Sequence, residues 1–366
     1  MFLDVSIRFP NLGITLNDLL MGITIFGFEI AFYGIIIAIG AMAGMALGFR
    51  EAKKTGQNVE HYVDLALFGL IFAIIGARLY YVIFKWDYYS KHLTEIFAIR
   101  DGGLAIYGGV IVAIIVAFIV AKIHKINFFL MADTGCIGLI LGQIIGRWGN
   151  FFNREAFGGY SDGLFAMQIN IDDGIVDIAV PDALKDTIMH LPEGDFIQVQ
   201  PTFLYESAWN LAVLIFIMIF KKYKRFNGEV FAWYIGGYGI GRFIIESFRT
   251  DSLYIPGTSI RASQVVAIVM VVAAVAICLV MRIKTAKTVV VAEPQTDVEV
   301  EVPETEPQTD VEVNVQETEA QPDAEVEVPE TESKPDAETN TQEQAALETE
   351  ASKQESMENE KSEITE

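Results

Sequence analysis

Residues 142–158 combine the types and spacing best suited to chemistry, because an apolar segment ends there in Gly, Asn, Arg and Glu. Arg147 and Asn150 are three residues apart and share a face while a helix continues. A guanidinium in a membrane segment is costly unless it faces a polar cavity, a partner or a lipid headgroup. Arg147 could simply extend to the membrane surface, but that leaves Asn150, Glu155 and Gly158 unexplained. The pattern indicates a functional site.

A second stretch, residues 234–249, repeats polar side chains inside an apolar segment. Tyr238, Arg242 and Glu246 recur every four residues, which stacks them on one helix face. Arg242 and Glu246 could form an internal ion pair that only neutralises itself. Alternatively, Glu246 orients Arg242 while the guanidinium still offers donors to a ligand.

Arg147 and Arg242 together suggest the class of ligand. Each is near the end of an apolar segment, and alternating spans bring both ends to the same side of a membrane. Arginine forks match phosphate oxygens and keep their charge when buried. The pair therefore predicts a phosphodiester ligand, with no need for a metal ion or cofactor, and nothing indicates a nucleic-acid partner.

A third stretch, residues 101–109, has two Gly-Gly pairs around Tyr107. Gly102 and Gly103 would allow close backbone approach and unusual dihedral angles, although glycine pairs in membrane helices often serve packing alone. Further ionisable residues interrupt apolar segments, which a purely structural bundle would avoid. These are Glu29, Asp64, Arg78, Asp133 and Glu206.

These stretches require a membrane scaffold to position them. The chain has 366 residues and is 52% hydrophobic. Seven segments are apolar over about 20 residues, the length that crosses a hydrocarbon core. They span roughly 27–49, 61–84, 103–121, 129–148, 203–221, 229–247 and 260–282. The predicted fold class is an all-α polytopic membrane protein with seven transmembrane helices.

Basic residues in the short connections predict the orientation. Lys and Arg cluster at 50–54, 122–125, 221–225 and 282–284, after the first, third, fifth and seventh segments. Alternating spans put all four clusters on one side, which is the cytoplasm by the positive-inside rule. The N-terminus is then outside and the C-terminus inside.

The rest of the chain divides into a membrane body, residues 1–286, and a tail, residues 287–366. Within the body, residues 150–200 are too long for a simple connection and predict a small extracytoplasmic head with some strand. Residues 288–366 hold 25 Asp and Glu against three Lys, so the formal net charge of −22 belongs to the tail. Its repeats, proline and like charges predict a disordered cytoplasmic segment.

Four motifs together resemble the phosphatidylglycerol–prolipoprotein diacylglyceryl transferase family, over about residues 15–285. The first is Gly146-Arg147-x-Gly149-Asn150-Phe151-x-Asn153-x-Glu155, closed by Gly158. The others are Gly102-Gly103-Leu104-x-x-Tyr107-Gly108-Gly109, Gln200-Pro201-Thr202-x-Leu204-Tyr205-Glu206 and Tyr238-Gly239-x-x-Arg242-x-x-x-Glu246-x-x-Arg249. Tyr33-Gly34 also matches the Tyr-Gly of the family's first span.

The resemblance implies transfer of a diacylglyceryl group from phosphatidylglycerol to the lipobox cysteine of prolipoprotein signal peptides. The products are a thioether and glycerol-1-phosphate, and the location is the bacterial plasma membrane. Arg147 and Arg242 would stabilise the phosphate leaving group. The remaining predicted substrate-binding residues are Asn150, Glu155, Gly158, Tyr33, Tyr238, Glu246, Gly102 and Gly103.

One departure from the family concerns the catalytic base. Many relatives have His where this chain has Tyr107, and a phenol with an ordinary pKa near 10 is a poor base at neutral pH. Tyr107 would need neighbouring guanidiniums to favour the phenolate, or it would position lipid or thiol by hydrogen bonding. The alternative function is a transporter or flippase for an anionic lipid, which would be expected to show repeated halves with interrupted helices.

Overall fold

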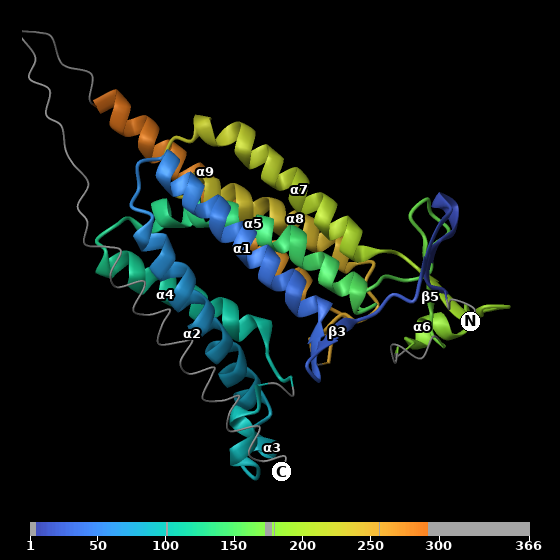
Figure 1. The fold of residues 1–366 in the computed structure, drawn as a ribbon. Helices are drawn as coiled ribbons and strands as arrows, with labels where there is room; N and C mark the ends of the chain where they lie inside the picture. Colours follow the sequence, from blue (N-terminus) through green and yellow to red (C-terminus); the bar gives the residue numbers. More distant parts are fainter. Residues whose placement is uncertain (1–4, 100–101, 173–177, 179, 256, 292–366) are drawn as a thin grey trace, which may run out of the picture. The chain divides into compact units, whose positions relative to one another are not determined.

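The computed structural model describes residues 5–99, 102–172, 178, 180–255 and 257–291. Within these ranges the chain is mostly helical (Figure 1). The predicted acidic tail falls mainly on residues 292–366, outside the described residues, so its disorder stays a prediction. The last described helix, α9 (Ala262–Val291), continues five residues past the predicted boundary at residue 286.

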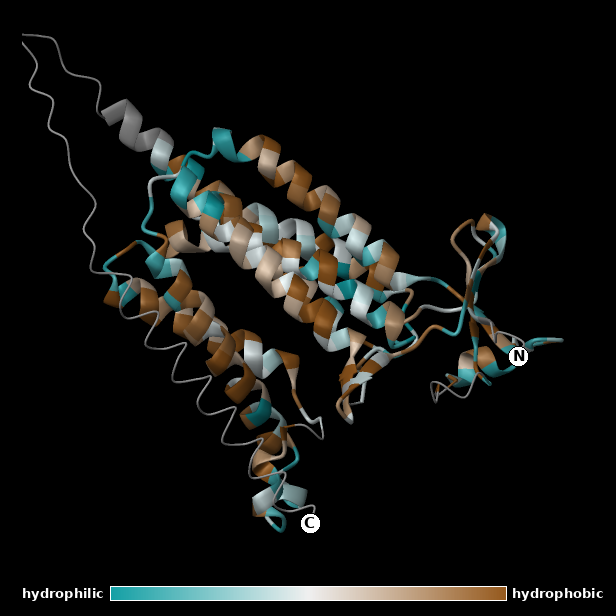
Figure 2. Cartoon of the chain, in the orientation of Figure 1, coloured by the Kyte–Doolittle hydropathy of each residue, from teal (hydrophilic) through white to brown (hydrophobic). Residues whose placement is uncertain are grey.

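Six of the described helices are long and apolar enough to cross a membrane, which supports a polytopic helical membrane fold. Figure 2 shows them apolar along most of their length, with hydrophilic residues gathered toward the ends. They are α1 (Phe32–Lys54), α2 (Glu60–Phe84), α4 (Ile106–Ile123), α5 (Phe128–Phe152), α7 (Thr202–Phe220) and α9. The short helices are η1 (Pro10–Leu12), α3 (Trp86–Tyr89), η2 (Leu93–Phe97), α6 (Asp182–Lys185) and η4 (Lys221–Tyr223).

The sixth predicted span, residues 229–247, corresponds to a helix that differs in character from the six apolar ones. Helix α8 (Glu229–Glu246) has 18 residues, about the minimum length for a span. It includes three charged residues, Glu229, Arg242 and Glu246, whereas each of the six apolar helices has an 18-residue window with at most two. Its charges make α8 the helix best suited to carry a polar site.

The predicted start of the first span was wrong by five residues. Residues 22–31 form a hairpin of strands β3 (Gly22–Ile25) and β4 (Phe28–Ala31), and α1 begins only at Phe32. A short continuous apolar run cannot be assigned to strand or helix from periodicity alone. Because the chain contains this hairpin, it is not purely α-helical as predicted.

Glycine contacts bring the helices close together. A Cβ atom on Gly44 of α1 would lie 2.5 Å from the carbonyl oxygen of Gly138 on α5. A Cβ atom on Gly76 of α2 would lie 2.9 Å from the carbonyl oxygen of Gly108 on α4. Small residues let membrane helices approach in this way. Gly108 therefore serves packing, the alternative considered for the Gly-Gly pairs.

A five-stranded antiparallel sheet forms outside the long helices, in the order β2-β1-β5-β7-β6. Its central strand, β5 (Met167–Asn170), pairs with β1 (Val5–Phe9) on one side and with β7 (Gly194–Val199) on the other. The outer strands are β2 (Ile14–Asn17) and β6 (Met189–Leu191). Strand β1, which the sequence analysis missed, thus pairs with a strand from the 150–200 segment, and β2 joins the sheet through β1. Ile7, Ile169 and Ile197 are fully buried in the core of this sheet.

Candidate active site

The centre of the candidate site is a buried carboxylate on α7, Glu206, which is 5% exposed. The Nε atom of Arg147, on α5, lies 2.9 Å from Oε2 of Glu206. The Nη1 atom of Arg242, on α8, donates to Oε1 at 2.8 Å. Nη1 of Arg249, just past α8, lies 3.5 Å from the same oxygen. One carboxylate thus joins three guanidiniums from different parts of the chain.

Two further carboxylates balance the charge of these arginines. Arg242 forms an ion pair with Glu246 one turn along α8, with Nη2 2.7 Å from Oε2. Arg249 forms a two-pronged pair with Asp251, with bonds of 2.9 and 2.7 Å. Buried charges need such partners because desolvation is expensive. Three cations and three anions make the cluster formally neutral.

The predicted Arg147–Asn150–Glu155 group is brought together by the end of α5. Asn150 donates from Nδ2 to Oε1 of Glu155 at 2.8 Å. Its Oδ1 lies 3.5 Å from Nη1 of Arg147, which is long for a strong hydrogen bond. Nε of Arg147 is thus held firmly by Glu206, whereas the far end of the guanidinium is held weakly. That end of Arg147 retains donors for a ligand.

Tyr33 packs against α5, the helix that carries Arg147, whereas Tyr238 lies on α8, the helix that carries Arg242. The ring of Tyr33, near the start of α1, lies against Gly149, where a Cβ atom would come within 2.8 Å of Cδ2. This contact holds Tyr33 beside the turn of α5 between Arg147 and Asn150. Tyr238 instead stacks on Tyr234, with ring centroids 6.1 Å apart. Of the predicted Tyr238, Arg242 and Glu246 face, the described contacts join only the last two.

Gly158 connects the segments that position Arg249. It forms an antiparallel bridge with Arg249, and its amide donates to the carbonyl of Gln200 at 2.9 Å. A Cβ atom there would lie 2.8 Å from Cβ of Gln200 and 3.0 Å from the carbonyl oxygen of Phe248. Only glycine fits without a shift. The structure thus gives Gly158 a backbone role at the edge of the cluster.

Tyr107, Gly102 and Gly103 lie on the α2–α4 side of the chain. Gly102 and Gly103 have φ angles of +87° and +70°, and their carbonyls accept from Nη1 of Arg78 at 2.8 and 3.0 Å. Arg78 also donates to the carbonyls of Glu95 and Ile96. Tyr107 begins α4 half-buried. Among the described residues it makes no hydrogen bond or ring contact with the arginine cluster.

Several charges that interrupt apolar segments have structural partners. Arg78 donates to the four backbone carbonyls named above. Asp133, on α5, accepts from the backbone amides of Gly228 and Phe231 at 2.8 Å each, which caps the start of α8. Oδ2 of Asp64 lies 2.9 Å from Nε2 of His124, and this contact joins α2 to the end of α4. Not every intramembrane charge therefore marks a binding site.

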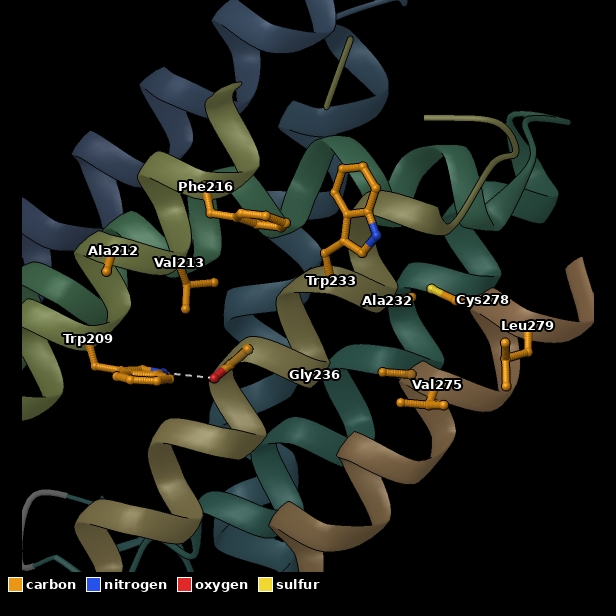
Figure 3. A pocket seen from close by; sticks show the side chains of 12 residues that line it. Trp209, Ala212, Val213, Phe216, Ala232, Trp233, Gly236, Val275, Cys278 and Leu279 are labelled. Atoms are coloured by element: carbon orange, nitrogen blue, oxygen red, sulfur yellow. Dashed lines mark hydrogen bonds between the residues drawn. The ribbon is translucent and has the colours of Figure 1, made fainter. Parts of the chain in front are cut away.

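An apolar hollow of about 510 Å³ lies between α7, α8 and α9 (Figure 3). Figure 3 shows the Trp209 indole reaching across it, where Nε1 donates to the carbonyl of Gly237 at 2.8 Å. Other lining residues are Val213, Phe216, Trp233, Val275 and Leu279. None of the clustered arginines or carboxylates lines it. The hollow is therefore separate from the polar site.

Glu206 is the main site residue that the sequence analysis did not assign. It was visible as a charge in an apolar segment and as the last residue of the Gln200–Glu206 motif. Which carboxylate meets the arginines depends on helix rotation, which the sequence alone does not specify.

Comparison with known proteins assigns most of the chain to one family. The profile of the family described as prolipoprotein diacylglyceryl transferase matches residues 21–280. Similar curated proteins are named phosphatidylglycerol–prolipoprotein diacylglyceryl transferase. The protein of Geobacillus kaustophilus is 42% identical over 255 residues, 70% of this chain and 89% of that one. Those of Clostridioides difficile and Finegoldia magna are each 40% identical, over 67% and 73% of this chain and 88% and 96% of theirs.

Proposed function

The chain belongs to the prolipoprotein diacylglyceryl transferase family, and we propose that the cluster around Glu206 is the site at which it binds phosphatidylglycerol and transfers the diacylglyceryl group. It is a transferase and a multi-pass bacterial membrane protein. Nothing in the comparisons favours the alternative of a lipid transporter.

The observation that carries the site proposal is that Arg147 and Arg242 approach neighbouring oxygens of one carboxylate. A phosphodiester also presents two oxygens on one centre, and guanidinium forks match that geometry. Arg147 holds Glu206 through Nε and keeps its far end available. We therefore assign phosphate binding to the far end of Arg147, with Arg242 beside it and Asn150 and Glu155 orienting the headgroup.

In the proposed reaction, the sulfur of a lipobox cysteine attacks the glyceryl carbon that bears the phosphate ester. A C–S bond forms, the C–O bond to phosphate breaks, and glycerol-1-phosphate leaves. The thiol proton ends on the released phosphate or in solvent. Negative charge grows on the leaving group, and fixed donors aimed at that charge lower the barrier. Arg147 and Arg242 supply such donors.

Tyr107 is proposed to position lipid or thiol by a hydrogen bond rather than to act as a base. A phenolate would need a nearby guanidinium, and the described contacts of Tyr107 include none. Gly102 and Gly103, held by Arg78, would set the height of the loop before Tyr107. Tyr33 would wall the site beside Arg147, and Gly158 would hold Arg249 through the backbone.

The proposed topology has seven spans including α8, with the N-terminus outside and the C-terminus in the cytoplasm. Ion pairs from two basic connections support it. Lys224 lies 3.3 Å from Asp133, and Arg282 donates to Glu229 at 2.6 Å. These pairs gather the ends of α5, α7, α8 and α9 opposite to the arginine cluster. The positive-inside rule then makes that end cytoplasmic.

The direct test is lipidation by the purified protein in phosphatidylglycerol liposomes. A peptide with a lipobox cysteine should gain a diacylglyceryl group while glycerol-1-phosphate appears in equal amount. The same peptide with serine in place of cysteine is the matched control and should not react. A protein that binds the liposomes but lipidates no cysteine peptide would contradict the proposed function.

A further inference from the structure

The β3–β4 hairpin has an apolar face that no other part of the described chain covers. The register pairs Ile23 with Ile30 and Ile25 with Phe28, and directly opposed residues share a face. All four side chains are exposed, and Phe28 is 65% exposed. The alternate positions on β3, Gly22 and Thr24, are small. The hairpin is therefore amphipathic.

The tip of the hairpin presents an aromatic ring at a conformational cost. Phe26 and Gly27 connect the strands with φ angles of +50° and +81°. Two-residue turns of this kind favour Asn-Gly, and a positive φ is unusual for a bulky residue. Phe26 is nonetheless 98% exposed. Unfavourable backbone conformations usually persist where they serve a function.

The hairpin is continuous with a membrane helix. β4 ends at Ala31 and α1 begins at Phe32 without a linker (Figure 1). The amide of Phe32 donates to the carbonyl of Met21 at 2.7 Å and closes the base of the hairpin. The Phe32 ring packs on Phe152 at the end of α5, with ring centroids 5.3 Å apart. The hairpin is thus fixed at the level where α1 begins and α5 ends, close to Arg147 in the sequence of α5.

We propose that this hairpin lies in the membrane interface on the side of the arginine cluster, with Phe26 and the Ile23–Ile25–Phe28–Ile30 face in contact with lipid chains. The interface favours one apolar face and one wet face. A two-stranded hairpin has unpaired backbone groups at its edges, which cannot enter the hydrocarbon core. This fixes the expected depth: side chains reach the acyl region while the strands stay at the headgroup level.

The inference concerns membrane contact and stands apart from the transfer reaction. It assigns the uncovered face to lipid rather than to a protein, because the hairpin ends where a membrane-spanning helix begins. A bilayer crossed by α1 necessarily reaches that point.

The test measures depth with a nitroxide label in nanodiscs that contain phosphatidylglycerol. Single cysteines replace Thr24, Ile25 or Phe26 in the full chain, in a Cys136→Ala/Cys278→Ala background that still lipidates peptide. Labels at residues 25 and 26 should collide readily with oxygen. Their collision rate with a water-soluble nickel chelate should be several-fold lower than that of the label at residue 24. The pair at 24 and 25 differs only in face.

Three results would overturn the proposal. Equally high nickel access at all three positions would put the hairpin in water. Low access of both reagents at 25 and 26 would mean that protein covers the face. Nickel exclusion at 24 as well would mean full insertion. A charge at the tip gives a second check. Phe26→Asp should raise the nickel access of the label at residue 25 several-fold, whereas the control Thr24→Asp should not. Unchanged nickel access in Phe26→Asp would contradict contact between Phe26 and lipid chains.

Discussion

Glu206 and Arg242 are 36 positions apart on different helices, yet Oε1 of the carboxylate accepts from Nη1 of the guanidinium at 2.8 Å. The other oxygen of the same carboxylate contacts Arg147. Glu206 is thus the one side chain of the cluster that sets the distance between both proposed phosphate ligands. It touches arginines rather than the reacting atoms, so we expect it to act as a positioning residue.

Glu206→Gln should therefore lower the lipidation rate, although Glu206 does not touch the reacting atoms. The amide keeps one acceptor oxygen but turns an NH₂ group toward a guanidinium. Losing one charge-assisted bond of about 1.5–3 kcal/mol corresponds to a roughly ten- to hundredfold slower rate. The measurement is kcat and KM for phosphatidylglycerol in liposomes. Full activity in Glu206→Gln would show that the arginines are placed by something else.

Glu246→Gln should have a milder effect, because Arg242 keeps its bond to Glu206. We expect a reduction of about tenfold, corresponding to the lower end of the value for one charge-assisted bond. The two glutamine variants should be compared at equal membrane levels. A larger loss in Glu246→Gln than in Glu206→Gln would reverse the assignment of the central carboxylate.

The Arg249–Asp251 pair predicts a pH dependence of stability. Burial raises the pKa of Asp251, but the hydrogen bonds and charge of Arg249 outweigh it and hold the pKa below its ordinary value of 3.8. A depressed carboxyl pKa contributes stability above that ordinary value, and the contribution is lost as the pH falls through the folded pKa. Asp251→Asn should thus lower Tm at neutral pH, and the difference from wild type should shrink below pH 3.8.

The measurement for this pair is Tm from neutral pH down to about pH 3. Asp186→Asn is the control, since Asp186 is exposed and has no ion pair among the described residues. A Tm difference for Asp251→Asn that stays constant over the whole range would contradict the proposed pair.

The proposed topology predicts opposite locations for two insertions. A reporter after Lys224 should read cytoplasmic, and one at Asp186, between β5 and β7, should read external. The two sites differ by one crossing through α7. A reversed pattern would put the arginine cluster at the cytoplasmic leaflet and overturn the proposed site for extracytoplasmic substrates.

The six apolar helices were predictable because hydropathy reports directly on membrane helices. The spacing of Arg242 and Glu246 predicted their ion pair, which the structure contains. The partners of Glu206 were not predictable, since they depend on how α5, α7 and α8 rotate against each other. Strand β1 was missed because its partner β5 lies about 160 residues away, and strand β4 was taken for the start of α1.

Arg147→Lys separates a phosphate ligand from a side chain that merely reaches the membrane surface. Arg147 contacts Glu206 through Nε and leaves its far end for the ligand. A lysine has one point charge, so it can serve Glu206 or the phosphate but cannot reproduce the fork. A surface-reaching lysine, in contrast, would behave like the arginine.

We expect Arg147→Lys to be nearly as inactive as Arg147→Ala. Losing one charge-assisted bond costs about 1.5–3 kcal/mol, or roughly ten- to a hundredfold in rate, and losing two leaves almost no turnover. The measurement is lipidation rate at matched membrane level. Arg282→Lys is the control, because Arg282 pairs with Glu229 away from the cluster and a lysine can keep that charge. Near-normal turnover of Arg147→Lys would remove Arg147 from phosphate binding and leave Arg242 as the main ligand.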